Sequence, residues 1–92
     1  MIKSFAHKGL EAFFEKGTTK GIDSKHSKKI GLVLGLLDAA EVVGDVNFPN
    51  SKLHQLLGKR KDTWSVSISG AWRITFEIED KNVYIVNYEQ YH

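Results

Sequence analysis

The sequence predicts an α+β fold in which two N-terminal helices pack on one face of a small, mostly antiparallel sheet. Apolar residues in the first half recur at i, i+3 and i+4, the period of a helix. Those in the second half alternate with polar residues, the period of a strand. The single proline, Pro49, lies between the halves beside Asn50 and Ser51, where it favours a loop.

The first half is expected to begin with a short strand over residues 2–6, followed by a helix. That helix is predicted from three apolar residues at helical spacing and a glycine stop signal: Leu10, Phe13, Phe14 and Gly17. A second, longer helix is predicted from Ser24 or Ser27 to Val43.

The longer helix is apolar over an unusually wide surface. One stripe consists of Ile30, Val33, Leu34 and Leu37, and another of Leu32, Leu36, Ala39 and Val43. A lone surface helix needs less apolar surface, so either the sheet and the first helix cover it or part of it awaits a partner. We expect most of these residues to be core. Gly31 and Gly35 each cost this helix about 1 kcal/mol relative to alanine, which predicts close backbone packing there.

The second half is expected to form four antiparallel strands. They are predicted over residues 52–57, 63–69, 71–79 and 83–88, with Gly58 ending the first and turns at residues 69–70 and 79–82. The last strand is apolar on both faces, which predicts that it is covered on both sides. Alternation places one polar set on the outer face of the sheet: Ser65, Ser67, Arg73 and Thr75.

Composition limits the class of protein. The 92 residues predict one domain spanning positions 1–92, and the 41% of hydrophobic residues argue against disorder. There is no cysteine and no signal-peptide pattern, and the apolar stretch of residues 30–43 is too short to span a bilayer, so a cytoplasmic location is expected without membrane contact. A net charge of +2 permits a polyanionic partner without requiring one.

No nucleotide-binding glycine motif, metal-ligand spacing or carboxylate cluster occurs, so a reaction without metal or cofactor is the simpler enzymatic hypothesis. RNA cleavage needs only proton transfer, phosphate binding and base stacking, which suit histidine, arginine and aromatic residues respectively. The residues that match are His54, Arg60, Arg73, Tyr91 and His92. Each also has a structural interpretation, namely a half-exposed strand histidine, solvated arginines and a frayed terminus.

Several segments resemble HigB-type toxins of the RelE/ParE superfamily. Residues 52–66 are similar to a K-L-H-x-L-x-G-x-R…W-S-[IV] motif, residues 72–76 to W-R-I-x-F, and residues 87–92 to N-Y-x-D-Y-H. The opening of the chain is similar too, so the resemblance covers nearly the whole sequence in order.

The resemblance implies a RelE-like microbial ribonuclease fold and the toxin of a type II toxin–antitoxin system, a ribosome-dependent endoribonuclease that cuts messenger RNA in the ribosomal A site. It implies catalytic roles for His54, Arg73, Tyr91 and His92. It implies RNA contacts by Lys52, Lys59, Arg60, Lys61 and Gln90. The implied partners are the 70S ribosome, messenger RNA and a HigA-like helix-turn-helix antitoxin in a toxin–antitoxin heterotetramer.

Two positions depart from the family pattern. Leu57 stands where these toxins commonly carry lysine, and Gln90 stands where they commonly carry aspartate. The first change removes a cation, and the second removes a carboxylate that orients a histidine. Two alternatives therefore remain beside an active nuclease: a weakened RNA- or ribosome-binding homologue, and a protein-interaction module that acts through its antitoxin.

Overall fold

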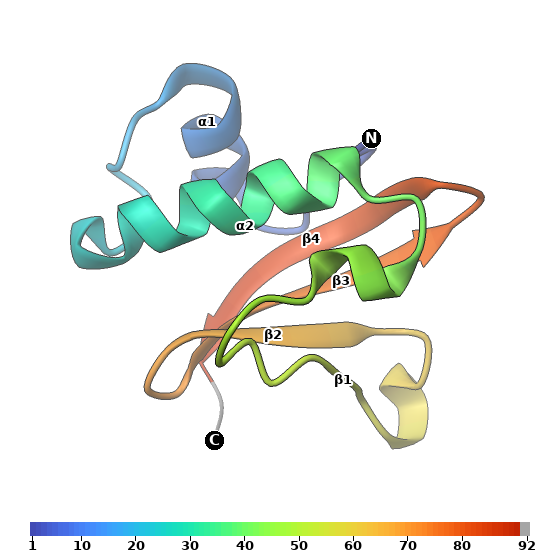
Figure 1. The fold of residues 1–92 in the computed structure, drawn as a ribbon. Helices are drawn as coiled ribbons and strands as arrows, with labels where there is room; N and C mark the ends of the chain where they lie inside the picture. Colours follow the sequence, from blue (N-terminus) through green and yellow to red (C-terminus); the bar gives the residue numbers. More distant parts are fainter. Residues whose placement is uncertain (91–92) are drawn as a thin grey trace.

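The computed structural model describes residues 1–90, and it confirms the predicted α+β architecture (Figure 1). Both α-helices lie on one side of a sheet whose strands follow one another in the order β1-β2-β3-β4, all antiparallel. The elements are α1 (Lys8–Lys16), η1 (Ser24–His26), α2 (Ser27–Ala39), η2 (Val43–Val46), β1 (His54–Gln55), η3 (Gly58–Arg60), β2 (Trp64–Ser69), β3 (Trp72–Glu79) and β4 (Asn82–Gln90).

Helix α1 forms where the spacing predicted it. The His7 side chain accepts a hydrogen bond from the backbone N–H of Leu10, 3.0 Å away, and so caps the first turn. Gly17 ends the helix with a φ of 76°, a left-handed conformation that glycine adopts without steric cost. Leu10 is fully buried and fixes this short helix to the core.

The close glycine packing lies at a place that the sequence did not indicate. Gly31 meets only the ring of Phe13, at 3.9 Å from an added Cβ, and Gly35 meets nothing within 4 Å, so the predicted close approach at these positions is wrong. Instead the backbones of Gly9 and Gly21 touch. A Cβ on Gly9 would lie 2.4 Å from the carbonyl oxygen of Gly21. The first turn of α1 therefore packs directly on the loop before α2.

This contrast predicts opposite effects for two glycine-to-alanine substitutions. Gly9→Ala is expected to destabilise the fold by about 1–3 kcal/mol, because the backbone of Gly21 must move. Gly35→Ala, on the exposed side of α2, should stabilise it by up to about 1 kcal/mol through helix propensity. Thermal melting of both variants checks the pair, and a raised Tm for Gly9→Ala would contradict the contact.

Helix α2 ends at Ala39, four residues earlier than predicted. The backbone turns extended at Ala40, with ψ at 137°, and the carboxylate of Asp45 accepts hydrogen bonds from the N–H groups of Glu41 and Val42 at 3.0 and 3.2 Å. Those donors would otherwise continue the helical ladder, so Asp45 holds the chain in a turn that leads into η2.

The strand predicted over residues 52–57 is only two residues long in the structure, where it forms β1. Lys52 has a φ of 51° and Leu57 precedes η3, so regular pairing with β2 is confined to His54–Gln55. Gly58, with a φ of 70°, ends the segment as expected. The result is a short edge strand followed by a loop that runs beside the sheet.

Strand β4 is bordered by the N-terminal segment rather than covered on both faces. Residues 2–6 form no regular strand, but Ile2 and Phe5 make isolated parallel bridges to Val83 and Val86. Between these bridges Ile85 has a φ of 55° and is half exposed, so the expected cover on both sides is absent there. The N-terminal segment thus pairs with the outer edge of β4 and leaves Ile85 at a bulge.

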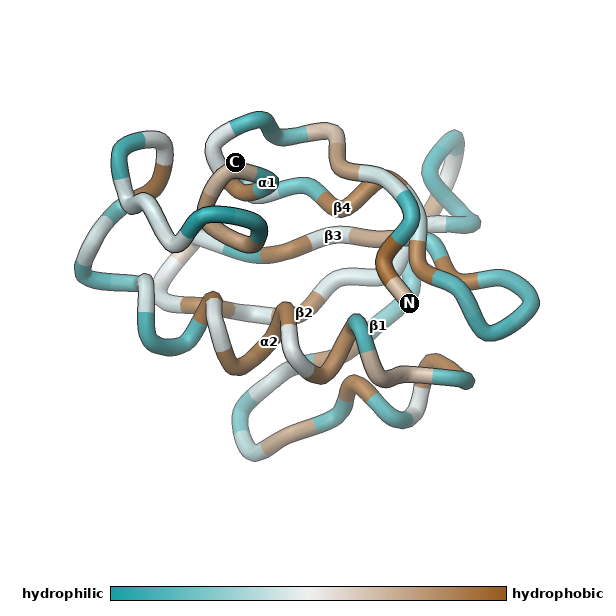
Figure 2. Tube along the Cα trace, turned by 90° about the horizontal axis from the view of Figure 1, so that it is seen from above, coloured by the Kyte–Doolittle hydropathy of each residue, from teal (hydrophilic) through white to brown (hydrophobic). Residues whose placement is uncertain are grey.

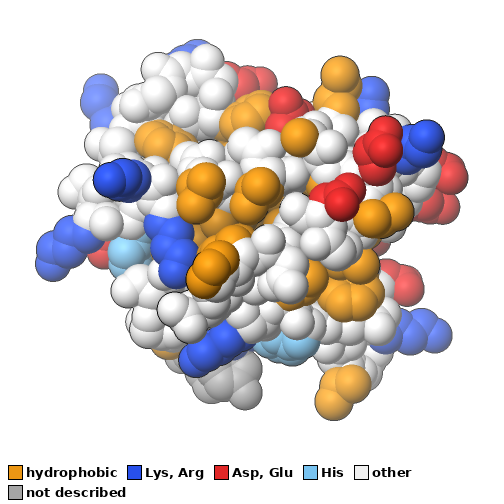
Figure 3. Space-filling model, in the orientation of Figure 1, with side chains coloured by type: hydrophobic (Ala, Val, Ile, Leu, Met, Phe, Trp, Pro, Cys, Tyr) orange, Lys and Arg blue, Asp and Glu red, His pale blue; other side chains and the backbone are white. Residues whose placement is uncertain are grey.

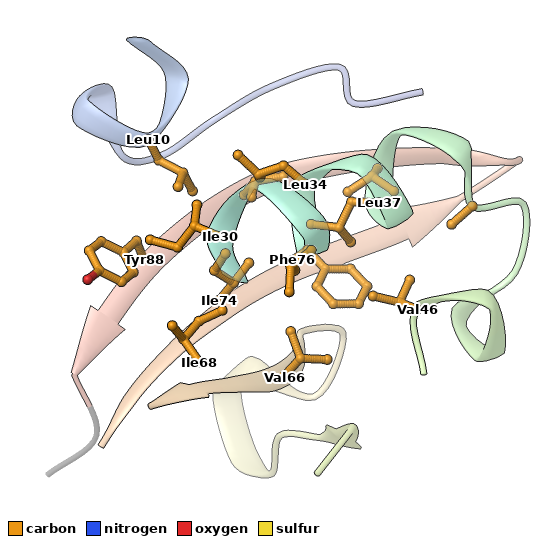
Figure 4. Close-up of a cluster of buried hydrophobic side chains, with 14 residues drawn as sticks. Leu10, Ile30, Leu34, Leu37, Val46, Val66, Ile68, Ile74, Phe76 and Tyr88 are labelled. Carbon is orange, nitrogen blue, oxygen red and sulfur yellow. The ribbon is translucent and has the colours of Figure 1, made fainter. Parts of the chain in front are cut away.

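The core lies between α2 and the inner face of the sheet (Figure 4). Hydrophobic residues recur along α2, β3 and β4, whereas hydrophilic residues concentrate in the loops (Figure 2). The predicted stripe of α2 is fully or almost fully buried, together with Phe76 of β3. Tyr88 stacks on Trp72 with ring centroids 4.6 Å apart, and its hydroxyl lies 2.6 Å from Nδ1 of His26, which joins the start of α2 to the sheet.

Candidate active site

The outer face of the sheet carries two rows of polar residues, which the strand register defines. Directly paired positions share a face of an antiparallel sheet. One row consists of His54, Ser65, Thr75 and Asn87, and the next of Ser67, Arg73 and Glu89. The predicted outer-face residues therefore do share a face, but Ser65 and Thr75 are buried, so this face is partly covered.

Three of the predicted site residues line one hollow on this face. It measures about 210 Å³ and brings Lys52 and His54 together with Arg73. Its other walls are Ser65, Ser67, Gly70, Ala71 and Trp72. An ammonium, an imidazole and a guanidinium around one hollow suit a phosphate group that must also exchange protons.

His54 is held in one tautomer by the backbone. Its Nδ1 lies 2.7 Å from the carbonyl oxygen of Lys52, and because a carbonyl only accepts, Nδ1 must carry the proton. In the neutral ring the lone pair is then on Nε2. The side chain is exposed, so this nitrogen belongs to a ring that solvent and substrate can reach.

The loop before His54 is fixed by a buried serine. The hydroxyl of Ser51 donates to Asn47 at 2.7 Å, and its carbonyl accepts from the N–H of Ser67 at 2.7 Å. On either side Asn50 and Lys52 have φ values of 65° and 51°, left-handed conformations that cost a non-glycine residue about 1–2 kcal/mol. This anchored turn places Lys52 and His54 against β2.

A network of donors converges on Glu89, which the sequence analysis did not single out. Both terminal nitrogens of Arg60 donate to the two carboxylate oxygens, at 2.9 and 2.8 Å. Thr75 donates to the same carboxylate at 2.7 Å and Asn87 at 3.2 Å. Mainly through Arg60, these bonds lower the pKa of Glu89 from its ordinary 4.5 to about 2, against the opposing effect of burial.

The lowered pKa predicts a loss of stability in acid. Because the folded value lies below the unfolded one, the stabilisation is complete above about pH 5 and disappears as the pH falls from 4.5 through 2. The pKa shift corresponds to about 3 kcal/mol of the free energy of unfolding. Solvent screening at the half-exposed Arg60 should reduce this contribution to on the order of 1–2 kcal/mol. Urea unfolding at pH 7 and pH 3 checks this: the stability gap between wild type and Glu89→Gln should narrow at pH 3. An equal gap at both values would contradict it.

The remaining predicted residues do not line the hollow. Lys59 in η3 and Lys61 directly after it are both exposed, and Arg60 donates to Glu89 instead. Gln90 is exposed opposite Trp72, a wall of the hollow. The departure Leu57 is 91% exposed. Tyr91 and His92 lie outside the described residues.

A larger hollow of about 500 Å³ lies elsewhere on the sheet, but its charge does not suit RNA. Its walls include Asp62, Glu77 and Glu79 together with Trp64 and Tyr84. Three carboxylates repel a phosphate backbone, so chemistry favours the smaller, cationic hollow over the larger one.

Residues 1–90 contain no group of three histidine, aspartate or glutamate side chains placed to hold a metal ion. The same part of the chain contains no helix long and apolar enough to cross a membrane.

The fold and the site together define a class. Helices on one face of an antiparallel meander and a cationic hollow on the other fit the RelE-like toxin that the sequence resembles, and a family model described as the RelE-like toxin of type II toxin–antitoxin system HigB matches residues 3–92. The chain is 45% identical over 92 residues to the protein named Endoribonuclease HigB from Proteus vulgaris, with 100% of both chains covered. The chain therefore belongs to the HigB-like family of toxins.

Proposed function

We propose that the chain is the ribosome-dependent endoribonuclease of a type II toxin–antitoxin system and that it cleaves messenger RNA in the ribosomal A site. The observation that carries this proposal is the hollow that gathers Lys52, His54 and Arg73 on one polar face. Membership of a toxin family and the similarity to a protein named an endoribonuclease support it.

The proposed reaction uses the substrate's own 2′-hydroxyl as nucleophile. The Nε2 lone pair of His54 takes the 2′-proton, the oxygen attacks the adjacent phosphorus, and the bond to the 5′-oxygen breaks. His92 protonates that leaving oxygen, and Arg73 stabilises charge on the phosphate. We propose, from the family resemblance, that Tyr91 stacks beside the scissile step. Lys52 adds a second positive charge to the hollow.

Purified protein incubated with 70S ribosomes and a defined message tests this function. Cleavage within the A-site codon is expected with ribosomes, and little cleavage is expected of the free message. Cleavage of ribosome-bound message should persist when a chelator lowers the free divalent ions as far as intact ribosomes allow, because no step of the proposed reaction uses a metal. No cleavage of ribosome-bound message, or activity restored to intact ribosomes by a divalent ion alone, would contradict the proposal.

A binding-only homologue is the second candidate, and the exposed Leu57 favours it. A lysine at this position would add a cation to the outer surface near η3, whereas leucine offers none. The same assay separates the two candidates, because binding to ribosomes without cleavage would support the second.

We further propose that a helix-turn-helix antitoxin binds the outer side of α2 in a heterotetramer. Family membership implies an antitoxin partner. Figure 3 shows hydrophobic side chains gathered at the centre of the helical face, and Leu32 on α2 is 58% exposed. This is the part of the apolar excess that the core does not use, which suits an apolar protein contact.

Leu32→Asp is expected to weaken co-purification with the product of the neighbouring small reading frame by about tenfold or more, because it places a charge in an apolar contact. Leu57→Asp is the matched control, since Leu57 is also exposed but lies beyond the short edge strand. Pull-down of co-expressed chains measures both. Equal retention of the partner by the two variants would exclude this face.

A further inference from the structure

Glu89 occupies an unfavourable position for an RNA-cleaving surface. It is the register partner of Arg73, so the two side chains rise from neighbouring strands on the same face. An ionised carboxylate there would oppose the negative charge of a phosphate bound by Arg73. The surface can bind phosphate well only if this charge is cancelled.

Arg60 supplies that cancellation through its planar fork. Its two terminal nitrogens donate to the two oxygens of Glu89 at 2.9 and 2.8 Å, and Thr75 and Asn87 both donate to Oε2 at 2.7 and 3.2 Å. These bonds, and above all those from Arg60, favour the ionised carboxylate and hold its pKa at about 2, so it is a very weak base at neutral pH. Glu89 is therefore not suited to act as a general base.

The ion pair also connects distant parts of the chain. Arg60 is the last residue of η3, and Glu89 lies near the end of the described part of β4. The side chain of Arg60 is about half exposed, whereas that of Glu89 is only 25% exposed. The pair thus fastens the cationic loop of residues 58–61 to the sheet beside the row that carries Arg73.

We propose that Glu89 and Arg60 are positioning residues, a charge-cancelling clasp that holds the loop against the sheet and offsets the negative charge of Glu89 beside the place where RNA phosphate binds. This inference rests on the proposed nuclease function. It gives Arg60 a different role from the direct RNA contact that the family resemblance implied. A lysine in place of Arg60 would keep the charge but lose the two parallel bonds.

A double-mutant cycle on ribosome-dependent cleavage tests the clasp. Arg60→Met should lower kcat/KM about tenfold, mainly through KM, because the negative charge of Glu89, no longer offset by Arg60, then opposes a bound phosphate. Glu89→Gln should lower it about threefold or less, because the amide carries no charge. The double variant should cleave within about threefold of Glu89→Gln alone, so that the second substitution relieves the first.

The cycle separates the clasp from direct RNA contact by Arg60. If Arg60→Met is equally damaging with Glu89 and with Gln at position 89, Arg60 touches the RNA itself and the inference is wrong. It is also wrong if Arg60→Met cleaves like wild type. If wild type fails to cleave ribosome-bound message at all, the proposed function fails and the inference falls with it.

Stability controls accompany the cycle. Glu15→Gln, an exposed carboxylate on α1, changes the net charge equally and should cleave like wild type. All assays run well below the lowest Tm of the set. If Arg60→Met does not fold, Arg60→Lys takes its place in the cycle. Its expected loss of kcat/KM is smaller, and Glu89→Gln should still relieve that loss. If Glu89→Gln leaves the loss unchanged, the clasp is wrong.

Discussion

Arg73→Ala and deletion of His92 are each expected to lower ribosome-dependent cleavage by on the order of 10²–10⁴-fold. Arg73 lines the cationic hollow between Ser67 and Glu89 in its row, and in the proposed mechanism its guanidinium binds the phosphate that gains charge in the transition state. His92 is the proposed proton donor to the leaving oxygen.

The structure refines the expected stability of these variants. The strand pattern alone placed Arg73 on an open polar face, where substitution costs less than about 0.5 kcal/mol. The side chain of Arg73 is in fact partly buried, so we expect a larger cost for Arg73→Ala, about 1 kcal/mol. Arg73→Lys, which keeps the charge and loses the fork, should retain an intermediate activity.

Growth inhibition, cleavage of ribosome-bound message and thermal melting should be measured on all three variants. Wild-type cleavage by both Arg73→Ala and the deletion, at an unchanged Tm, would remove these two residues from the mechanism and favour the binding-only homologue.

Phe76→Ala is expected to destabilise the fold by about 3–5 kcal/mol, a large part of the stability of so small a protein. Phe76 is fully buried in β3 and packs beneath α2, so its loss leaves a cavity in the single cluster of buried side chains within residues 1–90 (Figure 4). At about 4–8 °C per kcal/mol, Tm should fall by more than 10 °C, and growth inhibition should weaken with it.

Leu57→Ala is the control for this substitution. Leu57 is 91% exposed, so truncating it should change the free energy of unfolding by less than about 0.5 kcal/mol. Urea unfolding measures both variants. Similar losses for Phe76→Ala and Leu57→Ala would mean that the β3 core does not determine stability.

Several features were predicted from the sequence because they depend on local pattern. Alternation in β2 and β3 correctly separated Val66 and Ile74 from Ser67 and Arg73, since neighbouring residues of a strand point to opposite faces. Helical spacing identified the buried stripe of α2. Together with the motifs of residues 52–66 and 72–76, these patterns were enough to identify the fold and the toxin family.

Other predictions failed where a hydrogen bond with one particular polar side chain determined the local backbone. Asp45 ends α2 early by taking the N–H groups of Glu41 and Val42. The buried Ser51 holds the turn that shortens β1. Helix propensity and hydrophobic period take no account of such hydrogen bonds. The predicted end of α2 was therefore too late, and the predicted start of β1 was too early.

The sequence by itself determined the order of the main elements and most of the buried faces, and it named Lys52, His54 and Arg73 of the candidate hollow, because periodicity and residue type act within a few positions. Only the tertiary structure decided that Arg60 binds Glu89, 29 residues away, and that Gly9 rather than Gly31 or Gly35 makes the close backbone contact. Both depend on which strands and loops meet in space. Loop closure and sheet register determine these contacts, and neither can be predicted from a short segment of the sequence.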